Sequence, residues 1–119
     1  MSLVVYTKNM SMIKINYYST STGKEPCKVW MKKLDFITKS VVMKRLARVR
    51  LGNFGDTDPI GDGVYELRID YGSGIRVYYA KVNKTLVVLL MGGSKSTQAR
   101  DIEKAKRYWI DYRELADDK

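Results

Sequence analysis

The 119-residue sequence predicts an α+β domain, in which a small antiparallel or mixed sheet of about four strands is backed by helices. Three observations predict this class: three strand-like runs lie between Val64 and Leu90, two helical stretches precede them, and one helical stretch follows them. The expected order is therefore β-α-α-β-β-β-α. Residues 13–119 are expected to form one domain, and residues 1–12, which carry no clear pattern, an appendage with alternative starts at Met10 and Met12.

The first strand and the first helix are read from alternation and from spacing. Ile13–Tyr18 alternates as a half-buried strand does, and a Ser/Thr/Gly run then breaks it. Thr22 and Glu25 fit a capping box, whereas Pro26 is better placed at the first helical position. The apolar residues that recur at helical spacing are expected to be buried: Val29, Trp30, Leu34 and Ile37.

A second helix is expected from a cap at Ser40 to Gly52-Asn53, with a buried stripe of Val42, Leu46 and Val49. Asn53–Asp62 is then a turn-rich loop. Its three aspartates, D-x-D-x-x-x-D, lack the glycine and terminal glutamate of an EF-hand loop, so no metal site is expected there. A last helix from Gln98 to about Leu115 carries Ile102, Ala105 and Trp109 on its inner face.

The central hairpin allows its register to be argued. Val64–Asp70 and Ile75–Ala80 both alternate, and a three-residue Gly72–Gly74 loop would place Tyr71, Ile69 and Leu67 opposite Ile75, Val77 and Tyr79. The polar face, expected to be open, would then pair Arg68 with Tyr78 and Asp70 with Arg76. Leu86–Leu90 is apolar without alternation, which is typical of a central strand covered on both faces.

Composition limits the chemistry and the surroundings. Lys and Arg number 22 against 13 acidic residues, and residues 23–51 hold nine cations against two carboxylates. Such an excess points to a polyanion, an acidic protein or an anionic surface. With no histidine and a single Cys27, the chain has no structural zinc site, internal disulfide or histidine acid/base pair. No cofactor is expected, and the absence of a long apolar run or a signal peptide pattern predicts a cytoplasmic protein without a membrane segment.

The cations of the hairpin have two interpretations. In one, they form solvated cross-strand pairs, Asp70 with Arg76 and Glu66 near Arg68, each contributing about 0.2 to 1 kcal/mol. In the other, Arg68 and Arg76 clamp a phosphate, because guanidinium groups match phosphate oxygens in pairs. For RNA cleaved by its own 2′-hydroxyl, the candidate groups are Arg68, Arg76, Lys95 at the leaving oxygen, Glu66 as base and Tyr78 as acid.

RNA contacts are expected from two further sets. Tyr71 or Tyr78 would stack on an unpaired base. The basic helical hairpin, residues 23–51, suits ribosomal RNA or an acidic partner, or is simply a solvated face; its RNA-binding candidates are Lys32, Lys33, Lys44, Arg45 and Arg48.

Two long motifs, GVYELRIDYGSGIRVYYAK and VVLLMGGSKSTQARDIEKAKRYW, resemble a known family. Together with GKEP, WMKKL and RLARVRLGNFGD upstream, they are similar to the toxins of bacterial type II toxin-antitoxin modules, the RelE/HigB-like superfamily in its addiction module killer branch. The resemblance implies a RelE-like fold and a cytoplasmic mRNA endonuclease that works in the translating ribosome, needs no metal, and is silenced by a cognate antitoxin of helix-turn-helix type.

The resemblance also assigns residues. The arginine of the R-V-Y motif matches Arg76, that of E-L-R matches Arg68, and the cation after the glycine pair matches Lys95. Ser73, Ile75 and Ser94 depart from the residues common in the family, which are Pro, Tyr and Asp. Two alternatives stay open: a gyrase-poisoning toxin of the ParE-like branch, and a basic module that binds nucleic acid or ribosomes without catalysis.

Overall fold

The computed structural model describes residues 12–117, so the expected appendage falls almost wholly outside the described residues. The α+β class and the element order are confirmed, with one additional strand. The elements are β1 (Lys14–Tyr17), α2 (Pro26–Lys32), α3 (Phe36–Arg50), β2 (Thr57–Gly61), β3 (Val64–Ile69), β4 (Ile75–Lys81), β5 (Leu86–Ser94), the short 3₁₀ helix η1 (Lys95–Thr97) and α4 (Gln98–Asp117).

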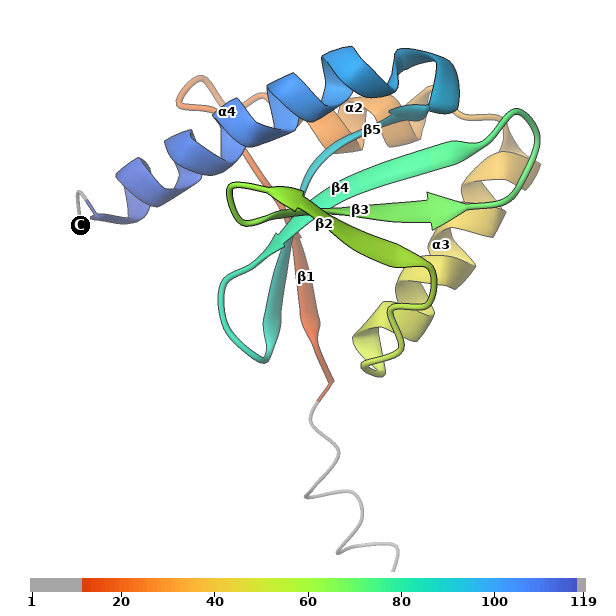
Figure 1. Cartoon of the computed structure of the whole chain (residues 1–119), viewed down its shortest axis with the longest axis horizontal. Coiled ribbons are helices and arrows are strands. Elements are labelled where there is room, and N and C mark those ends of the chain that lie inside the picture. The colour runs from red at the N-terminus through yellow and green to blue at the C-terminus, as the bar shows by residue number, and fades with distance from the viewer. Residues whose placement is uncertain (1–11, 118–119) are drawn as a thin grey trace, which may run out of the picture.

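All five strands belong to one mixed sheet in the order β1-β5-β4-β3-β2 (Figure 1). β1 runs parallel to β5, and every other pair is antiparallel. β5 therefore lies inside the sheet, and Val87–Leu90 are buried, as the unbroken apolar run predicted.

The register of the β3–β4 hairpin differs from the prediction by two residues. Ile69 lies opposite Ile75, and Leu67 opposite Val77, so that five residues, Asp70–Gly74, form the loop. The loop is closed by hydrogen bonds from Tyr71 N to Ile69 O at 3.0 Å and from Gly74 N to Tyr71 O at 3.0 Å. An even shift leaves every side chain on its predicted face. The cross-strand pairs do change: Arg68 now lies beside Arg76, and Glu66 beside Tyr78.

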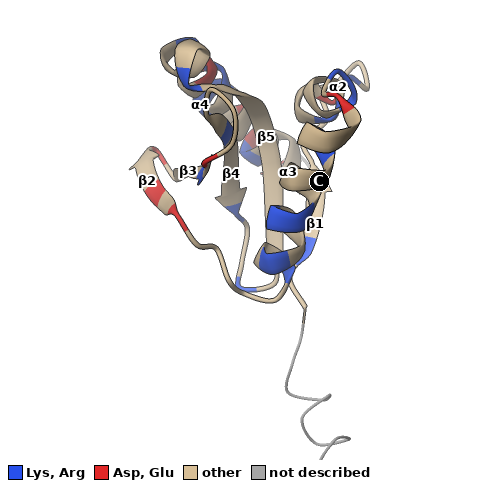
Figure 2. Ribbon diagram, turned by 90° about the vertical axis from the view of Figure 1, so that its right-hand side faces the viewer, with Lys and Arg blue, Asp and Glu red and all other residues tan. Residues whose placement is uncertain are grey.

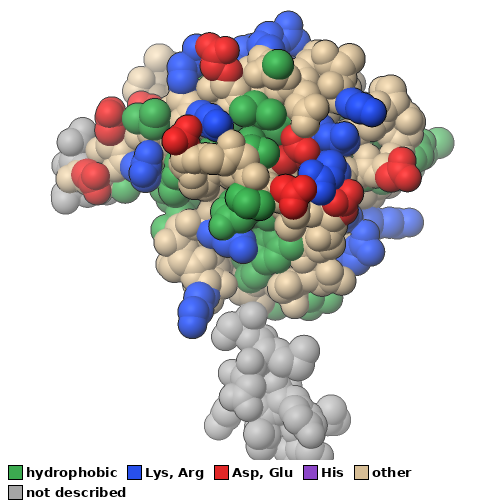
Figure 3. Space-filling model, in the orientation of Figure 1, with side chains coloured by type: hydrophobic (Ala, Val, Ile, Leu, Met, Phe, Trp, Pro, Cys, Tyr) green, Lys and Arg blue, Asp and Glu red, His purple; other side chains and the backbone are tan. Residues whose placement is uncertain are grey.

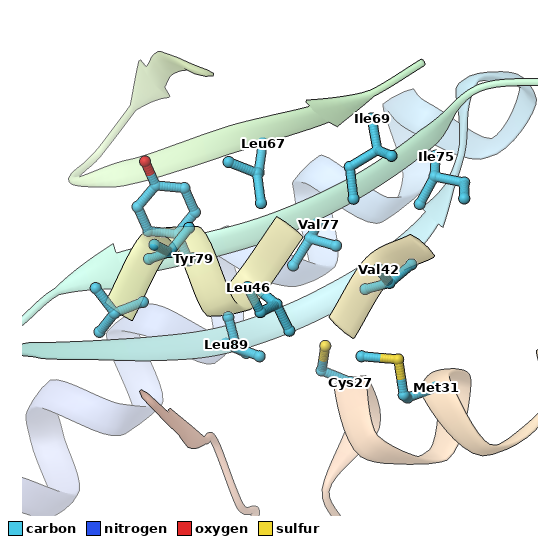
Figure 4. Packing of buried hydrophobic residues seen from close by; sticks show 12 residues of the cluster. Cys27, Met31, Val42, Leu46, Leu67, Ile69, Ile75, Val77, Tyr79 and Leu89 are labelled. Carbon is cyan, nitrogen blue, oxygen red and sulfur yellow. The ribbon is translucent and has the colours of Figure 1, made fainter. Parts of the chain in front are cut away.

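One face of the sheet packs against α2 and α3. Figure 4 shows Leu67, Ile69, Ile75, Val77, Tyr79 and Leu89 of the sheet against Cys27 and Met31 of α2 and Val42 and Leu46 of α3. The predicted stripe of α3 is confirmed, since Val42, Leu46 and Val49 are all buried. Burial of apolar surface stabilises a folded protein by roughly 25 cal/mol per Å² removed from water. The packing of α2 and α3 on the sheet is therefore a main source of stability.

The other face is not open, contrary to the prediction, because α4 lies across it. Ala105 and Trp109 of α4 are buried against Val64, Tyr78, Ala80, Val88 and Leu90, with Ile102 packed beside them. The inner face of the last helix is thus confirmed, but its location makes the domain three layers thick (Figure 1). Only the hairpin end of β3 and β4, beyond the start of α4, keeps polar side chains near the surface.

Of the two N-terminal helices, α2 begins at Pro26 as predicted, whereas α3 begins earlier than predicted. α2 starts with Pro26 at its first position and ends at Lys32, and Asp35 instead of Ser40 caps α3, accepting a hydrogen bond from Thr38 N at 2.8 Å. Because the chain turns between the two helices, the prediction that Val29, Trp30, Leu34 and Ile37 are all buried is wrong in part. Ile37 is 62% exposed and Val29 37% exposed, while Trp30 and Leu34 are half-buried.

The predicted Asn53–Asp62 loop contains an unpredicted edge strand, β2, which pairs with β3 from Thr57 to Gly61. An edge position explains how this strand tolerates Pro59. Among the helices of residues 12–117, none combines the length and apolar character needed to cross a membrane.

Candidate functional site

Glu66 joins three elements at the hairpin end of the sheet. It is 3% exposed, and its Oε1 lies 3.3 Å from Arg68 Nη1 and 3.5 Å from Arg76 Nε. Its Oε2 accepts a hydrogen bond of 2.6 Å from Gln98 Nε2 on α4. A buried carboxylate needs such partners. Glu66 therefore holds the two arginines and the start of α4 together, and its position does not suit the role of a free base.

Arg68 is occupied by carboxylates on several sides. Asp56 accepts from Nε at 3.1 Å and from Nη2 at 2.6 Å, and Asp58 accepts from Nη2 at 2.8 Å, in addition to the contact with Glu66. These bonds, first of all those to Asp56, raise the pKa of Arg68 further above its usual range. Figure 3 shows acidic and basic side chains adjoining over β2 and β3. Most donors of this guanidinium are thus committed, which does not suit the expected phosphate clamp.

Arg76 and Lys95 meet beside Gly74. A Cβ placed on Gly74 would lie 3.5 Å from Arg76 Nη1 and 3.3 Å from Lys95 Cβ, and Lys95 N donates to Gly74 O at 3.1 Å. The Arg76 side chain is 13% exposed, so it reaches the surface at its tip. Lys95 is exposed, and within residues 12–117 no carboxylate lies within 4 Å of its amine. The structure therefore brings together two of the three predicted cations as groups that an anion can contact.

Tyr78 lies deeper than expected. Its ring is fully buried beneath α4, and its hydroxyl makes no hydrogen bond to any described residue. Burial, aided by the nearby charges of Glu66 and Asp101, raises the pKa of this phenol above its usual range. Tyr78 is thus a neutral phenol buried in the core, and the expectation that it points to an open side of the sheet is wrong.

Sequence reasoning missed the polar residues of α4. Asp101 is 2% exposed and accepts a hydrogen bond from Thr97 Oγ1, which in turn accepts one from Ser94 N at 3.2 Å. Gln98 and Asp101 occur at the spacing of the inner face that Ala105 and Trp109 continue. The occurrence of Gln98 and Asp101 on the otherwise apolar inner face of this helix could have predicted buried polar contacts between α4 and the sheet.

Two hollows adjoin the hairpin end. The first, called here the hairpin groove, has a volume of about 430 Å³ and lies between the α2–α3 turn, the β3–β4 loop and the start of α4; its lining includes Trp30, Leu34, Thr38, Tyr71, Gly74, Ser94 and Arg100. The second, the α3 groove, has a volume of about 740 Å³ and is lined by Val41, Lys44, Arg45, Arg48, Gly55, Asp56, Arg68, Ile69 and Asp70. Tyr71, which is 36% exposed, is one of the residues that line the hairpin groove.

The basic candidates of α2 and α3 divide into two sets. Lys32, Lys33, Lys44 and Arg48 are exposed. In Figure 2 the positions of basic residues are coloured blue along the ribbon of α3. Arg45 is 6% exposed, and its guanidinium donates to the carbonyls of Phe54, Asp56 and Arg68. The expectation that Arg45 lies on the exposed helix face is therefore wrong, because it ties α3 to the loop before β2.

The aspartates of the 53–62 segment are paired with cations. Asp56 and Asp58 contact Arg68, and Asp62 lies 3.6 Å from Lys106 Nζ. Within residues 12–117 there is no group of three or more acidic, histidine or cysteine side chains arranged to hold a metal ion.

Comparison with known proteins places most of this structure within one family. Residues 29–109 match the family described as "Phage derived protein Gp49-like (DUF891)", a range that runs from α2 into α4. The range contains Glu66, Arg68, Arg76, Tyr78, Lys95, Gln98 and Asp101. An uncharacterized protein from Haemophilus influenzae is 49% identical over 78 residues, which cover 65% of this chain and 79% of that protein.

Proposed function

Since the chain belongs to the family of phage-derived Gp49-like proteins, we propose that it is the toxin of a type II toxin-antitoxin module. Its activity would be that of the RelE/HigB-like toxins it resembles, the metal-independent cleavage of mRNA in the translating ribosome. The observation that carries this proposal is the meeting of Arg76 and Lys95 beside Gly74, at the rim of the sheet.

Two cationic side chains that share a glycine neighbour suit a phosphodiester. Arg76 is held by two neighbours, because its Nε lies 3.5 Å from Glu66 Oε1 and its Nη1, beside Gly74, donates to the carbonyl of Ile75 at 3.2 Å. Lys95 follows the glycine pair of β5 and is held at its backbone by Gly74. An anchored guanidinium and an exposed amine then bind non-bridging and leaving oxygens from two sides.

The proposed reaction needs charge stabilisation above all. The 2′-oxygen forms a bond to phosphorus, the P–O5′ bond breaks, the 2′-proton passes to an acceptor, and the 5′-oxygen gains a proton. Arg76 stabilises the phosphorane, and Lys95 stabilises the leaving oxygen. Removing one such donor from an enzyme typically costs about 10²- to 10³-fold in rate. Glu66 and Arg68 serve as positioning residues, since both are engaged by their neighbours.

Partners and location complete the proposal. Lys32, Lys33, Lys44 and Arg48 are exposed cations suited to ribosomal RNA, and Tyr71 is placed to stack on a base at the hairpin groove. A cognate antitoxin, of helix-turn-helix type in this branch, would silence the toxin in the cytoplasm.

A second candidate function deserves the same test. Among the described residues, the two predicted proton-transfer groups, Glu66 and Tyr78, are both buried, and Arg68 is engaged by Asp56 and Asp58. This favours the use of the scaffold for protein binding, as in a gyrase-poisoning toxin of the ParE-like branch, where no cleavage chemistry is needed.

The experiment is induced expression of the chain and its variants in a bacterial host. Arg76→Ala and Lys95→Ala should abolish growth arrest and the appearance of transcript ends inside codons, which primer extension detects. Lys84→Ala is the matched control, because Lys84 is an exposed cation in the turn at the opposite end of β4. Circular dichroism should show that all three variants remain folded.

The outcomes separate the candidates. Transcript ends that vanish with Arg76→Ala and persist with Lys84→Ala support the nuclease. Growth arrest without new transcript ends, accompanied by gyrase cleavage complexes, would replace it with the gyrase poison. A folded Arg76→Ala variant that still cleaves mRNA would refute the assigned site.

A further inference from the structure

Another hollow lies at the far end of β4, away from Arg76 and Lys95. It has a volume of about 430 Å³, and separate parts of the chain line it: Ile13, Phe54, Lys81, Asn83, Lys84 and Val87. Figure 3 shows hydrophobic side chains in this region, between the loop before β2 and the β4–β5 turn, with basic side chains beside them. We call this hollow the distal pocket.

Part of the wall of the distal pocket is apolar and fixed in place. Val87 is buried, and Ile13 and Phe54 pack against the same hydrophobic core. The Phe54 ring stacks on Tyr79, with 5.6 Å between the ring centroids. Sites for small ligands typically have volumes of about 300–1,000 Å³ and mostly apolar walls, with a few polar groups that fix the orientation of the ligand. The distal pocket has this size and this kind of wall.

Lys81 supplies the distal pocket with a positioned positive charge. Its Nζ lies 4.6 Å from the centroid of the Phe54 ring and 4.9 Å from that of the Tyr65 ring. Because an aromatic ring has no net charge, these contacts orient the ammonium group and leave its charge unpaired. In the described part of the chain, no carboxylate lies within 4 Å of this amine. An anion that binds Lys81 therefore breaks no ion pair.

Asn83 adds a hydrogen-bond donor to the distal pocket. Its Oδ1 accepts hydrogen bonds of 2.8 Å from the amide and from the hydroxyl of Thr85. Since the side-chain oxygen is engaged within its own turn, the NH₂ group is the part that can bind a ligand. The turn is closed by a hydrogen bond from Val82 N to Leu86 O at 2.9 Å, which holds Asn83 beside the pocket.

The wall, the cation and the donor together describe the ligand. They suit a flat ring system that carries hydrogen-bond acceptors and an anionic group. A nucleotide has all three features, because its base packs on apolar and aromatic side chains and accepts hydrogen bonds, and its phosphate binds an ammonium group. A fatty acid would leave the Asn83 donor unused. A transition metal ion does not suit the pocket, since its lining contains no carboxylate, thiolate or imidazole.

We propose that the distal pocket binds a free nucleoside monophosphate, with the base against Ile13 and Phe54 and the phosphate at Lys81. One positioned cation suits one phosphate, whereas a single strand of RNA is held by a basic groove that follows its backbone. The binding is independent of the proposed function, because Arg76 and Lys95 lie at the Ile75 end of β4 and Lys81 is its last residue.

The test is a titration of the full, isotope-labelled chain with AMP and with GMP, followed by NMR. The backbone signals of Ile13, Phe54 and Asn83 should shift and saturate, while the signal of Gly74 should not move. Lys81→Gln keeps most of the side-chain stem and removes the charge. It should weaken binding by about 10-fold or more, as expected when a hydrogen bond to a charged group is lost. Lys81→Arg, which keeps the charge, should restore most of the affinity.

Lys14→Gln is the matched control. Lys14 is an exposed lysine that follows Ile13 directly, and successive residues of a strand point to opposite faces of the sheet. The variant removes the same charge as Lys81→Gln, and the affinity should stay unchanged. Ile13→Ser tests the apolar wall and should weaken binding several-fold. Circular dichroism should show that these variants remain folded.

Several results would overturn the proposal. They are the absence of saturable shifts with either nucleotide, an unchanged affinity in Lys81→Gln, and an equal loss of affinity in Lys14→Gln, which would indicate attraction by net charge alone.

Two other ligands have their own readouts in the same titration. A 2′-O-methyl RNA oligonucleotide cannot be cleaved through its 2′-oxygen; if it shifts the pocket signals and the free nucleotides do not, the pocket serves RNA and the proposal is overturned. It is likewise overturned if only oleate shifts these signals. Growth arrest by the wild-type chain tests the proposed function alone, so either proposal can fail while the other stands.

Discussion

The glycine pair of β5 fits the two helical layers onto opposite faces of the sheet. Successive strand residues point to opposite faces, and a Cβ on Gly92 would lie 2.1 Å from Trp30 Cε3 of α2. On the next residue, a Cβ on Gly93 would lie 1.9 Å from Asp101 Oδ2 and 2.8 Å from Thr97 Oγ1. Both helices thus approach the strand more closely than any side chain would allow.

Gly93→Ala should therefore destabilise the domain strongly. The new methyl group must displace the buried Asp101 carboxylate, which breaks its hydrogen bond with Thr97 and moves the first turn of α4. Overpacking of a core costs about 1–3 kcal/mol, and a lost buried hydrogen bond about 1–2 kcal/mol more. The expected loss is thus about 2–5 kcal/mol, or roughly 10–20 °C in the melting temperature of a domain of this size.

Thermal and urea unfolding followed by circular dichroism measure this loss. Gly23→Ala is the control, because Gly23 has a φ of +89° with no atom within 4 Å of its would-be Cβ. It reports only the backbone cost of an alanine in the left-handed region, about 1–2 kcal/mol. A Gly93→Ala protein no less stable than Gly23→Ala would refute the close approach of α4 to β5.

Two further predictions concern buried groups. Arg45→Met keeps the apolar stem but leaves the Phe54 carbonyl without its donor, whereas the Asp56 carbonyl keeps its hydrogen bond from Arg68 N. The variant should cost about 1–3 kcal/mol in urea unfolding, and an equal effect of the exposed Arg48→Met would contradict this. For Cys27, burial raises the pKa of the thiol from 9.0 to about 12. The unfolded thiol ionises first, so this contribution to stability is complete below pH 9 and falls by about 1.4 kcal/mol per pH unit above it. Urea midpoints at pH 8 and 10.5 should drop further for wild type than for Cys27→Ala, and equal drops would show that the thiol is not shielded.

Local pattern was sufficient for the last helix and for every strand except β2, but not for the register of the β3–β4 hairpin. The alternation of Val64–Ile69 and Ile75–Lys81 determines only which side chains share a face, so it excludes odd shifts and allows even ones. The structure selects the five-residue loop, which also contains Tyr71 and is held by a hydrogen bond from Lys95 N to Gly74 O. That contact joins the β3–β4 loop to η1, which lies outside the hairpin, so no pattern within the hairpin predicts it.

Two further differences from the prediction, the start of α3 and the strand β2, also have identifiable causes. The stripe of Val29 to Ile37 has helical spacing throughout, yet Asp35 caps a new helix, and the direction of the chain changes there. Periodicity cannot detect such a turn when apolar residues continue through it. β2 is rich in turn-forming residues, and it is a strand because β3 offers it an edge to pair with.

In the candidate site, the face of the sheet on which α4 packs determines which polar groups are buried, and the sequence pattern of the helix does not predict that face. Gln98, Asp101, Ala105 and Trp109 identify the inner face of α4, but nothing within the helix says which face of the sheet receives it. Once α4 covers the side that was expected to be open, Glu66 becomes an internal link to Gln98. The same covering stops short of the hairpin end, where the tip of Arg76 reaches the surface and Lys95 is exposed. The helix therefore selects, from one polar strand face, which groups are structural and which remain available to an anion.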